Sequence, residues 1–267
     1  MKKIAELFKS IKLKHILVPL LLGTVTIFLI YTPEGLLGKA DAIGYAVCHR
    51  IPSRSFFIGE RQLPLCVRCT GMHLGAFIGF IYQLKYKKHG NMPSKKFIVI
   101  LGLLFIAFAL DGLNSYLHLF PKAPGVYEPQ NWLRLLTGVG LGIGISAVLF
   151  PTFNQTVWRD WVEESSLQSW RQVAELLIIS IIFYFLTLSE NLLVLYPVAL
   201  ITSFNIILIL ATIYTIIWIL IFKRENTFNS IIDLKYFFMM GIICSFVQIL
   251  LMDLARYNIT GTWEGFF

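Results

Sequence analysis

The sequence predicts an all-α integral membrane protein with about seven transmembrane helices, an inside N-terminus and an outside C-terminus. Hydrophobic residues make up 57% of the chain and charged residues 14%, against roughly a quarter charged in soluble domains. Apolar runs long enough to cross the hydrocarbon core recur along the chain. Seven alternating spans place 15 of the 23 Lys and Arg on one side, which the positive-inside rule assigns to the cytoplasm.

The amino-terminal segment joins a basic stretch to the first apolar run. Residues 1–15 carry five lysines and a stripe of apolar residues, which predicts a short helix on the cytoplasmic surface. The first span is expected at Ile16–Tyr31. A cleaved signal peptide is the alternative, with Ala-x-Ala at residues 40–42 as its cleavage site. An uncleaved anchor is favoured, because the apolar run is longer than a signal core and the Ala-x-Ala lies well beyond it.

Six further spans follow, and the loop after the second span is basic, as expected of an inner loop. Residues 36–47 are expected to form a helix outside the membrane. Residues 152–171, with three tryptophans among charges, predict an amphipathic helix at the inner interface. Glycines at 71, 75 and 79 recur every fourth residue, which predicts that another helix approaches closely. The expected spans are Leu65–Leu84, Phe97–Phe120, Asn131–Phe150, Val173–Leu188, Pro197 to just before Lys223, and Tyr236 onward.

Cysteine and histidine gather between residues 48 and 73. Cys66, Cys69 and His73 are spaced i, i+3, i+7, so one helical face carries all three, and a loop can bring Cys48 and His49 back onto that face. Thiolate and imidazole donors predict a soft-metal site, with zinc favoured over iron or copper and either histidine as a ligand. Two alternatives stay open: thiol–disulfide exchange at Cys66 and Cys69, and a structural disulfide.

Polar residues inside the spans concentrate in the outer half of the protein. Ionisable groups in a membrane are costly and face a cavity or a partner, so we expect one polar site open to the outside. Asp111 and His118 are the candidate catalytic residues. An Asp111–Arg134 ion pair that only bridges helices is the alternative. Four residues are the candidate ligands of an anionic substrate: Arg50, Arg54, Asn114 and Arg134.

These patterns favour a metal-dependent membrane enzyme that acts on an anionic or lipid-linked substrate. A carrier or binding protein for a metal or a small anion is the alternative, and a redox protein that uses Cys66 and Cys69 is a third. No P-loop, dinucleotide-binding or nucleophile-elbow motif occurs, and no nucleic-acid partner is expected. Membrane lipids are expected partners, while the oligomeric state and the choice between enzyme and carrier stay open.

The segments CHRIPSRSF (48–56) and LPLCVRCTGMHLG (63–75) resemble the signature of an uncharacterised bacterial family of polytopic membrane proteins, a domain of unknown function. Asp111 and NWLRLLTG (131–138) fit the same resemblance. It implies a bacterial cytoplasmic-membrane protein and no particular activity. We expect a single polytopic membrane domain over 1–267, in which 44–145 carries the signature and 172–267 adds further spans.

Overall fold

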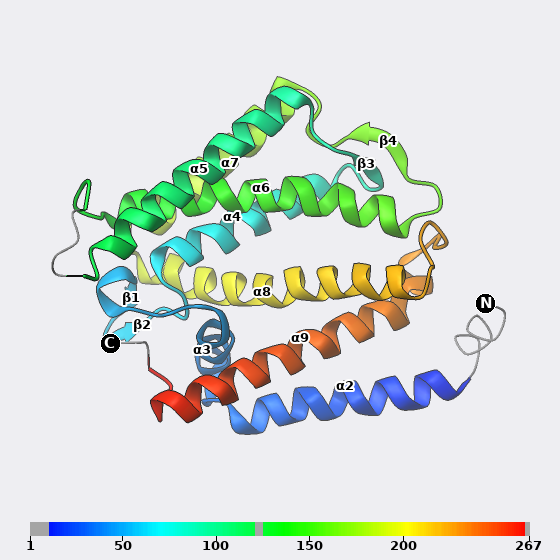
Figure 1. The fold of residues 1–267 in the computed structure, drawn as a ribbon, viewed down its shortest axis with the longest axis horizontal. Helices are drawn as coiled ribbons and strands as arrows, with labels where there is room; N and C mark the ends of the chain where they lie inside the picture. The colour runs from blue at the N-terminus through cyan, green and yellow to red at the C-terminus, as the bar shows by residue number, and fades with distance from the viewer. Residues whose placement is uncertain (1–10, 121–124, 265–267) are drawn as a thin grey trace.

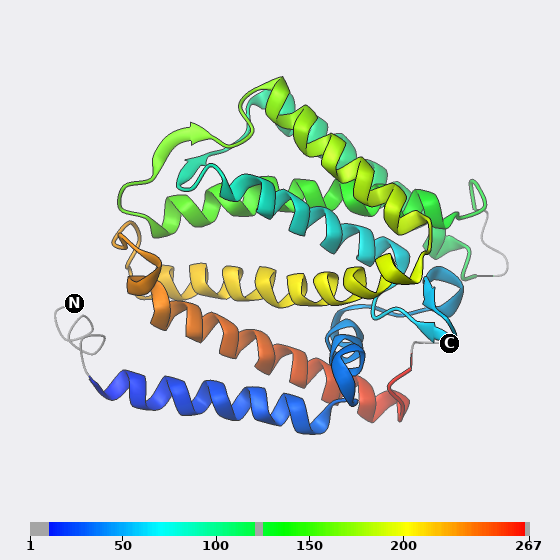
Figure 2. The ribbon, with the colours of Figure 1, turned by 180° about the vertical axis from the view of Figure 1, so that it is seen from behind.

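A computed structural model describes residues 11–120 and 125–264 and shows a bundle of seven long helices (Figure 1). Successive long helices run in alternating directions, so the chain passes back and forth through the bundle (Figures 1 and 2). The predicted fold class is confirmed. The seven helices are α2 (Ile11–Tyr31), α4 (Val67–Leu84), α5 (Lys95–Leu117), α6 (Asn131–Val157), α7 (Trp170–Leu188), α8 (Leu192–Ile221) and α9 (Ile231–Thr260).

Among the described residues, six of these helices are long and apolar enough to span a membrane, and α4 is the one that is not. Helix α4 packs mainly against α6 and α8, and 11 of its 18 residues are buried. A helix that other helices shield from lipid does not need an apolar surface, which is why α4 can carry buried polar residues such as His73 and Gln83.

The contact between α4 and α6 depends on glycines of both helices, as the spacing in α4 predicts. A Cβ atom added to Gly71 would lie 2.5 Å from the backbone oxygen of Leu135. Cβ atoms at Gly75 and Gly142 would also collide with backbone atoms of the partner helix. The two backbones therefore approach so closely that only glycine fits at these positions.

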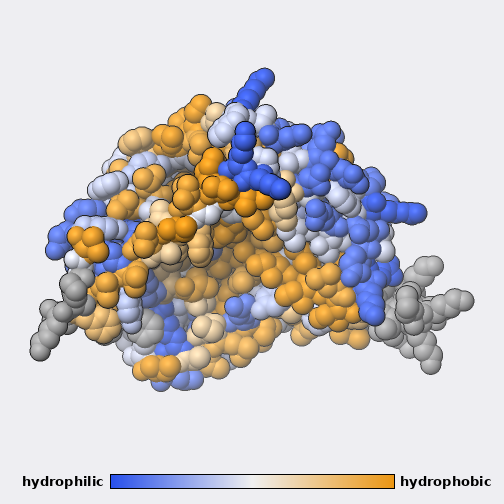
Figure 3. Space-filling view, turned by 45° about the horizontal axis from the view of Figure 1, so that its top comes forward, coloured by the Kyte–Doolittle hydropathy of each residue, from blue (hydrophilic) through white to orange (hydrophobic). Residues whose placement is uncertain are grey.

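The bundle has two chemically different ends. We call one the cysteine end; it holds the short helix α3 (Gly35–Val47), the turn η1 (Pro52–Arg54) and the hairpin β1 (Phe57–Ile58) with β2 (Arg61–Gln62). The opposite end, the lysine end, holds the parallel pair β3 (His89–Asn91) and β4 (Val162–Ser165). Between them, hydrophobic side chains cover a hollowed face of the molecule, with hydrophilic side chains toward its edges (Figure 3).

The predicted amphipathic helix over residues 152–171 is wrong. Helix α6 continues through Pro151 to Val157, and β4 then pairs with β3 before a capping box at Ser169 starts α7. The side chain of Asn154 donates to the backbone oxygens of Lys87 and His89, at 3.0 and 2.8 Å. This tie holds the end of α6 against the β3 turn, and the residues that follow pair with β3 instead of forming a helix.

Within the described residues, the other predicted helices are present, and several begin or end at different residues than expected. Helix α3 confirms the helix expected at residues 36–47. Helices α8 and α9 begin several residues earlier than expected, and α5 ends three residues before Phe120. The surface helix expected at residues 1–15 lies mostly outside the described residues, and its last five residues belong to α2.

Candidate functional site: a cysteine cluster beside an arginine cluster

Three cysteines meet at the cysteine end of the bundle. Cys48 directly follows α3, Cys66 caps the start of α4, and Cys69 lies in the first turn of α4. Their sulfur atoms all lie within 4.8 Å of one another. All three are free thiols; Cys48 and Cys66 are buried and Cys69 is partly buried.

The loop after α3 returns Cys48 to the start of α4. Arg50, with a φ of +52°, turns the chain in the left-handed region that favours glycine. Its buried guanidinium holds this turn, because it donates to Asp41 at 3.0 Å and to the backbone oxygen of Trp263 at 3.1 Å. The backbone N–H of Cys66 then donates to the Cys48 sulfur at 3.2 Å.

The surroundings of the cluster favour a negative charge on the sulfur of Cys48. Hydrogen bonds from the thiols of Cys66 and Cys69 hold the pKa of Cys48 well below its usual range, although burial opposes this shift. Arg256 of α9 reaches the same loop and donates to the backbone oxygens of Tyr45 and Cys48, at 2.6 and 2.5 Å. The N-terminus of α4 adds the positive end of a helix dipole.

Neither predicted histidine ligand belongs to the cluster in the described residues. The Nε2 atom of His49 is buried without a hydrogen-bond partner in the described part of the chain. Burial lowers the pKa of His49; the charge of Cys48 opposes this shift and the nearby arginines add to it. The net lowering favours the neutral ring, which is the form that binds a metal. His73 is buried in α4, and its backbone oxygen accepts from Asn205 of α8 at 2.9 Å.

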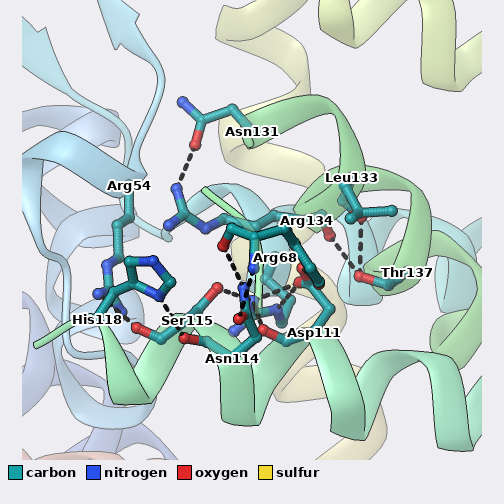
Figure 4. Close-up of polar contacts among 11 residues, drawn as sticks. Arg54, Arg68, Asp111, Asn114, Ser115, His118, Asn131, Leu133, Arg134 and Thr137 are labelled. Carbon is teal, nitrogen blue, oxygen red and sulfur yellow. Dashed lines mark hydrogen bonds and ion pairs between the residues drawn. The ribbon is translucent and has the colours of Figure 1, made fainter. Parts of the chain in front are cut away.

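Three arginines from three elements form a second group, which we call the arginine cluster: Arg54 of η1, Arg68 of α4 and Arg134 of α6 (Figure 4). Arg134 interacts electrostatically with both of the other arginines, with Asp111 and with Cys66. The arginine cluster therefore borders the cysteine cluster.

Asp111 forms an ion pair with Arg68. The alternative prediction, an Asp111–Arg134 ion pair, is therefore wrong. The Nη2 and Nε atoms of Arg68 donate to one Asp111 oxygen at 2.5 and 3.1 Å (Figure 4). The Tyr127 hydroxyl donates to the other Asp111 oxygen at 2.7 Å. Asp111 is 2% exposed. A carboxylate held by a guanidinium and a phenol is poorly suited to the proton transfer expected of it.

Arg134 is less well partnered. One of its nitrogens donates to Asn131 at 2.7 Å, and its buried Nε has no hydrogen-bond partner in the described part of the chain. Arg54 donates to the backbone oxygen of Ser115 at 2.7 Å. Within the described residues, Asp111 is the one carboxylate that forms an ion pair with any member of the arginine cluster. The cluster thus has three positive charges against one negative charge.

The other predicted site residues have local roles. The Asn114 side chain accepts from the backbone N–H of Val126 at 2.7 Å and donates to the oxygen of Tyr127 at 2.8 Å, so it ties down the loop before α6. Arg50, as described above, anchors the Cys48 turn. His118 lies at the end of α5, partly exposed, with Nδ1 2.9 Å from the backbone oxygen of Asn114.

Sequence reasoning missed the structural roles of Arg68 and Asp41. Arg68 lies inside the Cys-x-x-Cys motif and is not among the predicted site residues, yet it is the ion-pair partner of Asp111. Asp41 forms ion pairs with both Arg50 and Arg61. The sequence does offer one signal for the Arg68–Asp111 ion pair, which is the depth of the two residues in the membrane. Arg68 lies in the outer turn of one span and Asp111 lies in the outer turns of the next.

The comparisons with known proteins cover this same region. A family model described as "Predicted membrane protein (DUF2085)" matches residues 48–148. An uncharacterized protein of Methanothermobacter thermautotrophicus is 34% identical over 102 residues, which are 38% of this chain and 83% of the relative. An uncharacterized protein of Methanocaldococcus jannaschii is 29% identical over 120 residues, 44% of this chain and 70% of the relative. No solved structure matches. Both relatives are archaeal, so they lend no support to the bacterial origin expected above.

Proposed function

The chain belongs to the DUF2085 family of predicted membrane proteins, and we propose that it is a metal-dependent membrane enzyme for a phosphate-bearing substrate. In this proposal Cys48, Cys66 and Cys69 bind one soft metal ion, zinc, and the arginine cluster binds the anionic group. The observation that carries the proposal is the meeting of three free sulfurs from two chain segments within 4.8 Å.

The number of sulfurs favours a metal over a disulfide. A disulfide would join two sulfurs at about 2.0 Å and leave the third cysteine without a role. A tetrahedral zinc ion, with Zn–S bonds of about 2.3 Å, uses all three sulfurs at separations of about 3.8 Å. The sulfurs already lie within 4.8 Å of one another, so small side-chain movements would complete the site.

The fourth position decides what such a metal does. Structural zinc sites have four protein ligands, whereas catalytic sites have three and leave one position for water or substrate. His49 and His73 are the candidates for a fourth protein ligand. If neither binds, the metal supplies a Lewis acid that activates water or polarises the substrate.

The charge balance of the arginine cluster supports an anionic substrate. Arg134 is 6% exposed, and its Nε lacks a partner in the described part of the chain. Uncompensated charge away from water is costly, and a bound anion would offset that cost. Guanidinium groups match phosphate oxygens in bidentate geometry. His118, partly exposed at the edge of the cluster, is the remaining candidate for proton transfer.

Metal content tests the first half of the proposal. We expect about one zinc per chain in protein purified in detergent, measured by elemental analysis. Serine at Cys48, Cys66 or Cys69 should reduce the content at least tenfold, because the site needs every thiolate. Cys244→Ser is the matched control, since Cys244 lies in α9 outside the cluster. Zinc-supplemented wild type without metal, or equal loss in the control, would contradict the proposal.

Anion binding tests the second half. We expect Arg134→Gln to weaken binding of inorganic phosphate, or of phosphatidic acid in mixed micelles, by about tenfold or more, since hydrogen bonds to charged groups contribute about 1.5–3 kcal/mol. Arg61→Gln is the control, because Arg61 pairs with Asp41 outside the arginine cluster. The probe that binds more tightly distinguishes a water-soluble substrate from a lipid-linked one. Equal affinity of Arg134→Gln and wild type for both probes would contradict an anion site.

The redox alternative rests on Cys66 and Cys69 at the N-terminus of α4, a position that favours thiolate. It predicts a reversible Cys66–Cys69 disulfide in the isolated protein. Thiol titration before and after reduction separates the two cases, because a metal-bound site yields its thiols on chelation without any reductant.

A further inference from the structure

A second feature lies at the lysine end of the bundle, far from the cysteines in the fold. A cavity of about 810 Å³ opens between α4, α6, α8 and α9. Its walls are mainly aromatic and aliphatic, and they include Phe77, Phe80, Phe153, Leu208 and Met239. The proposed function makes no use of this cavity.

The polar side chains Asn154 and Thr212 in its wall already have hydrogen-bond partners. The Asn154 amide donates to two backbone oxygens of the β3 turn, and its oxygen accepts from Trp158 at 2.9 Å. The Thr212 hydroxyl donates to the Leu208 oxygen at 2.7 Å. Away from the exposed Asn229 and Ser230 at the helix end, the wall therefore offers mainly apolar contacts to a bound molecule.

Lysines stand at the rim of the cavity, where the helices end. Lys87, Lys88 and Lys235 all line it. Lys88 pairs with Asp160 at 2.5 Å, whereas Lys87 and Lys235 are exposed and form no ion pair in the described part of the chain. The turn presents Lys87 with a φ of +49°, and the Asn154 side chain holds its backbone oxygen at 3.0 Å.

We propose that this cavity binds one anionic phospholipid. An acyl chain lies among the aromatic side chains, and the headgroup phosphate lies between Lys87 and Lys235. The cavity opens toward lipid, because its outer lining residues Leu84 and Ile231 are 60% and 76% exposed. Basic pockets between transmembrane helices near the membrane surface bind anionic headgroups in this way. This inference is independent of the metal site.

Native mass spectrometry of the full chain in detergent, titrated with phosphatidylglycerol, tests the proposal. We expect one tightly bound phosphatidylglycerol per chain and at least tenfold weaker binding of phosphatidylcholine. The double variant Lys87→Gln with Lys235→Gln should weaken phosphatidylglycerol binding about 30-fold, since each lysine near an anionic headgroup contributes about 1 kcal/mol. Glycerol phosphate, which has the headgroup charge without acyl chains, should not bind.

Lys95→Gln with Lys96→Gln is the matched control, because it removes two exposed lysines from the first turn of α5, outside the cavity. We expect its affinity to stay within twofold of wild type. A second variant, Thr212→Phe, fills the cavity and should remove the bound lipid while both rim lysines remain. Equal binding of the two lipids, or equal loss in the control pair, would overturn the proposal. Retention of the lipid by a folded Thr212→Phe protein would do the same.

Discussion

Replacing Asp111 with asparagine would leave the arginine cluster without its ion-paired carboxylate. Asp111 is 2% exposed, and the side chain of its partner Arg68 is 14% exposed, so water can replace little of the lost interaction. Arg68 would keep hydrogen bonds to Ser115 and to the Asp111 backbone oxygen. Breaking a buried ion pair from one side costs about 3–5 kcal/mol, and we expect Asp111→Asn to lose about that much stability.

A double-mutant cycle separates the ion pair from its neighbours. Arg68→Gln together with Asp111→Asn removes both charges, so the double variant should recover part of the loss. Arg134→Gln is the informative contrast. Because Arg134 forms no ion pair in the described part of the chain, this change should leave stability near that of wild type while weakening anion binding.

Denaturant titration in detergent, followed by tryptophan fluorescence, measures all five proteins: wild type, Asp111→Asn, Arg68→Gln, their double variant and Arg134→Gln. The reasoning would be refuted if Asp111→Asn unfolds within about 0.5 kcal/mol of wild type. It would also be refuted if Arg134→Gln destabilises the protein as much as Asp111→Asn does. The first result would mean that the Arg68–Asp111 pair does not stabilise the cysteine end, and the second would mean that Arg134 has a structural role instead of a ligand-binding one.

Two further predictions concern packing and orientation. Gly75→Ala should destabilise the protein by about 1–3 kcal/mol, since its Cβ would collide with the α6 backbone. Gly102→Ala in α5, where a Cβ meets nothing within 4 Å, should be neutral or stabilising by up to about 1 kcal/mol in the same titration; equal losses would contradict the close α4–α6 contact. A cysteine at exposed Glu190, at the cysteine end, should react with a membrane-impermeant maleimide in intact cells. A cysteine at Lys223 should react only after permeabilisation, and the reverse pattern would invert the orientation.

The sequence by itself determined the spans and the depth of most polar residues. Hydropathy predicts the spans and these depths, because the solvation free energy of each backbone and side-chain group depends on its depth in the membrane. Local periodicity also sufficed to predict that Cys66 and Cys69 share a helical face, since i, i+3 spacing needs no tertiary information.

Tertiary structure decided which groups at one depth meet. Arg68 of α4 and Arg134 of α6 both lie in the outer turns of spans, and the packing of α4, α5 and α6 places Asp111 of α5 against Arg68. The return of Cys48 to α4 depends on the Arg50 turn and its anchor at Asp41. The cavity at the lysine end needs four helices from distant parts of the chain. Hydropathy specifies depth but not rotation or neighbours, because those depend on how side chains of separate helices fit together.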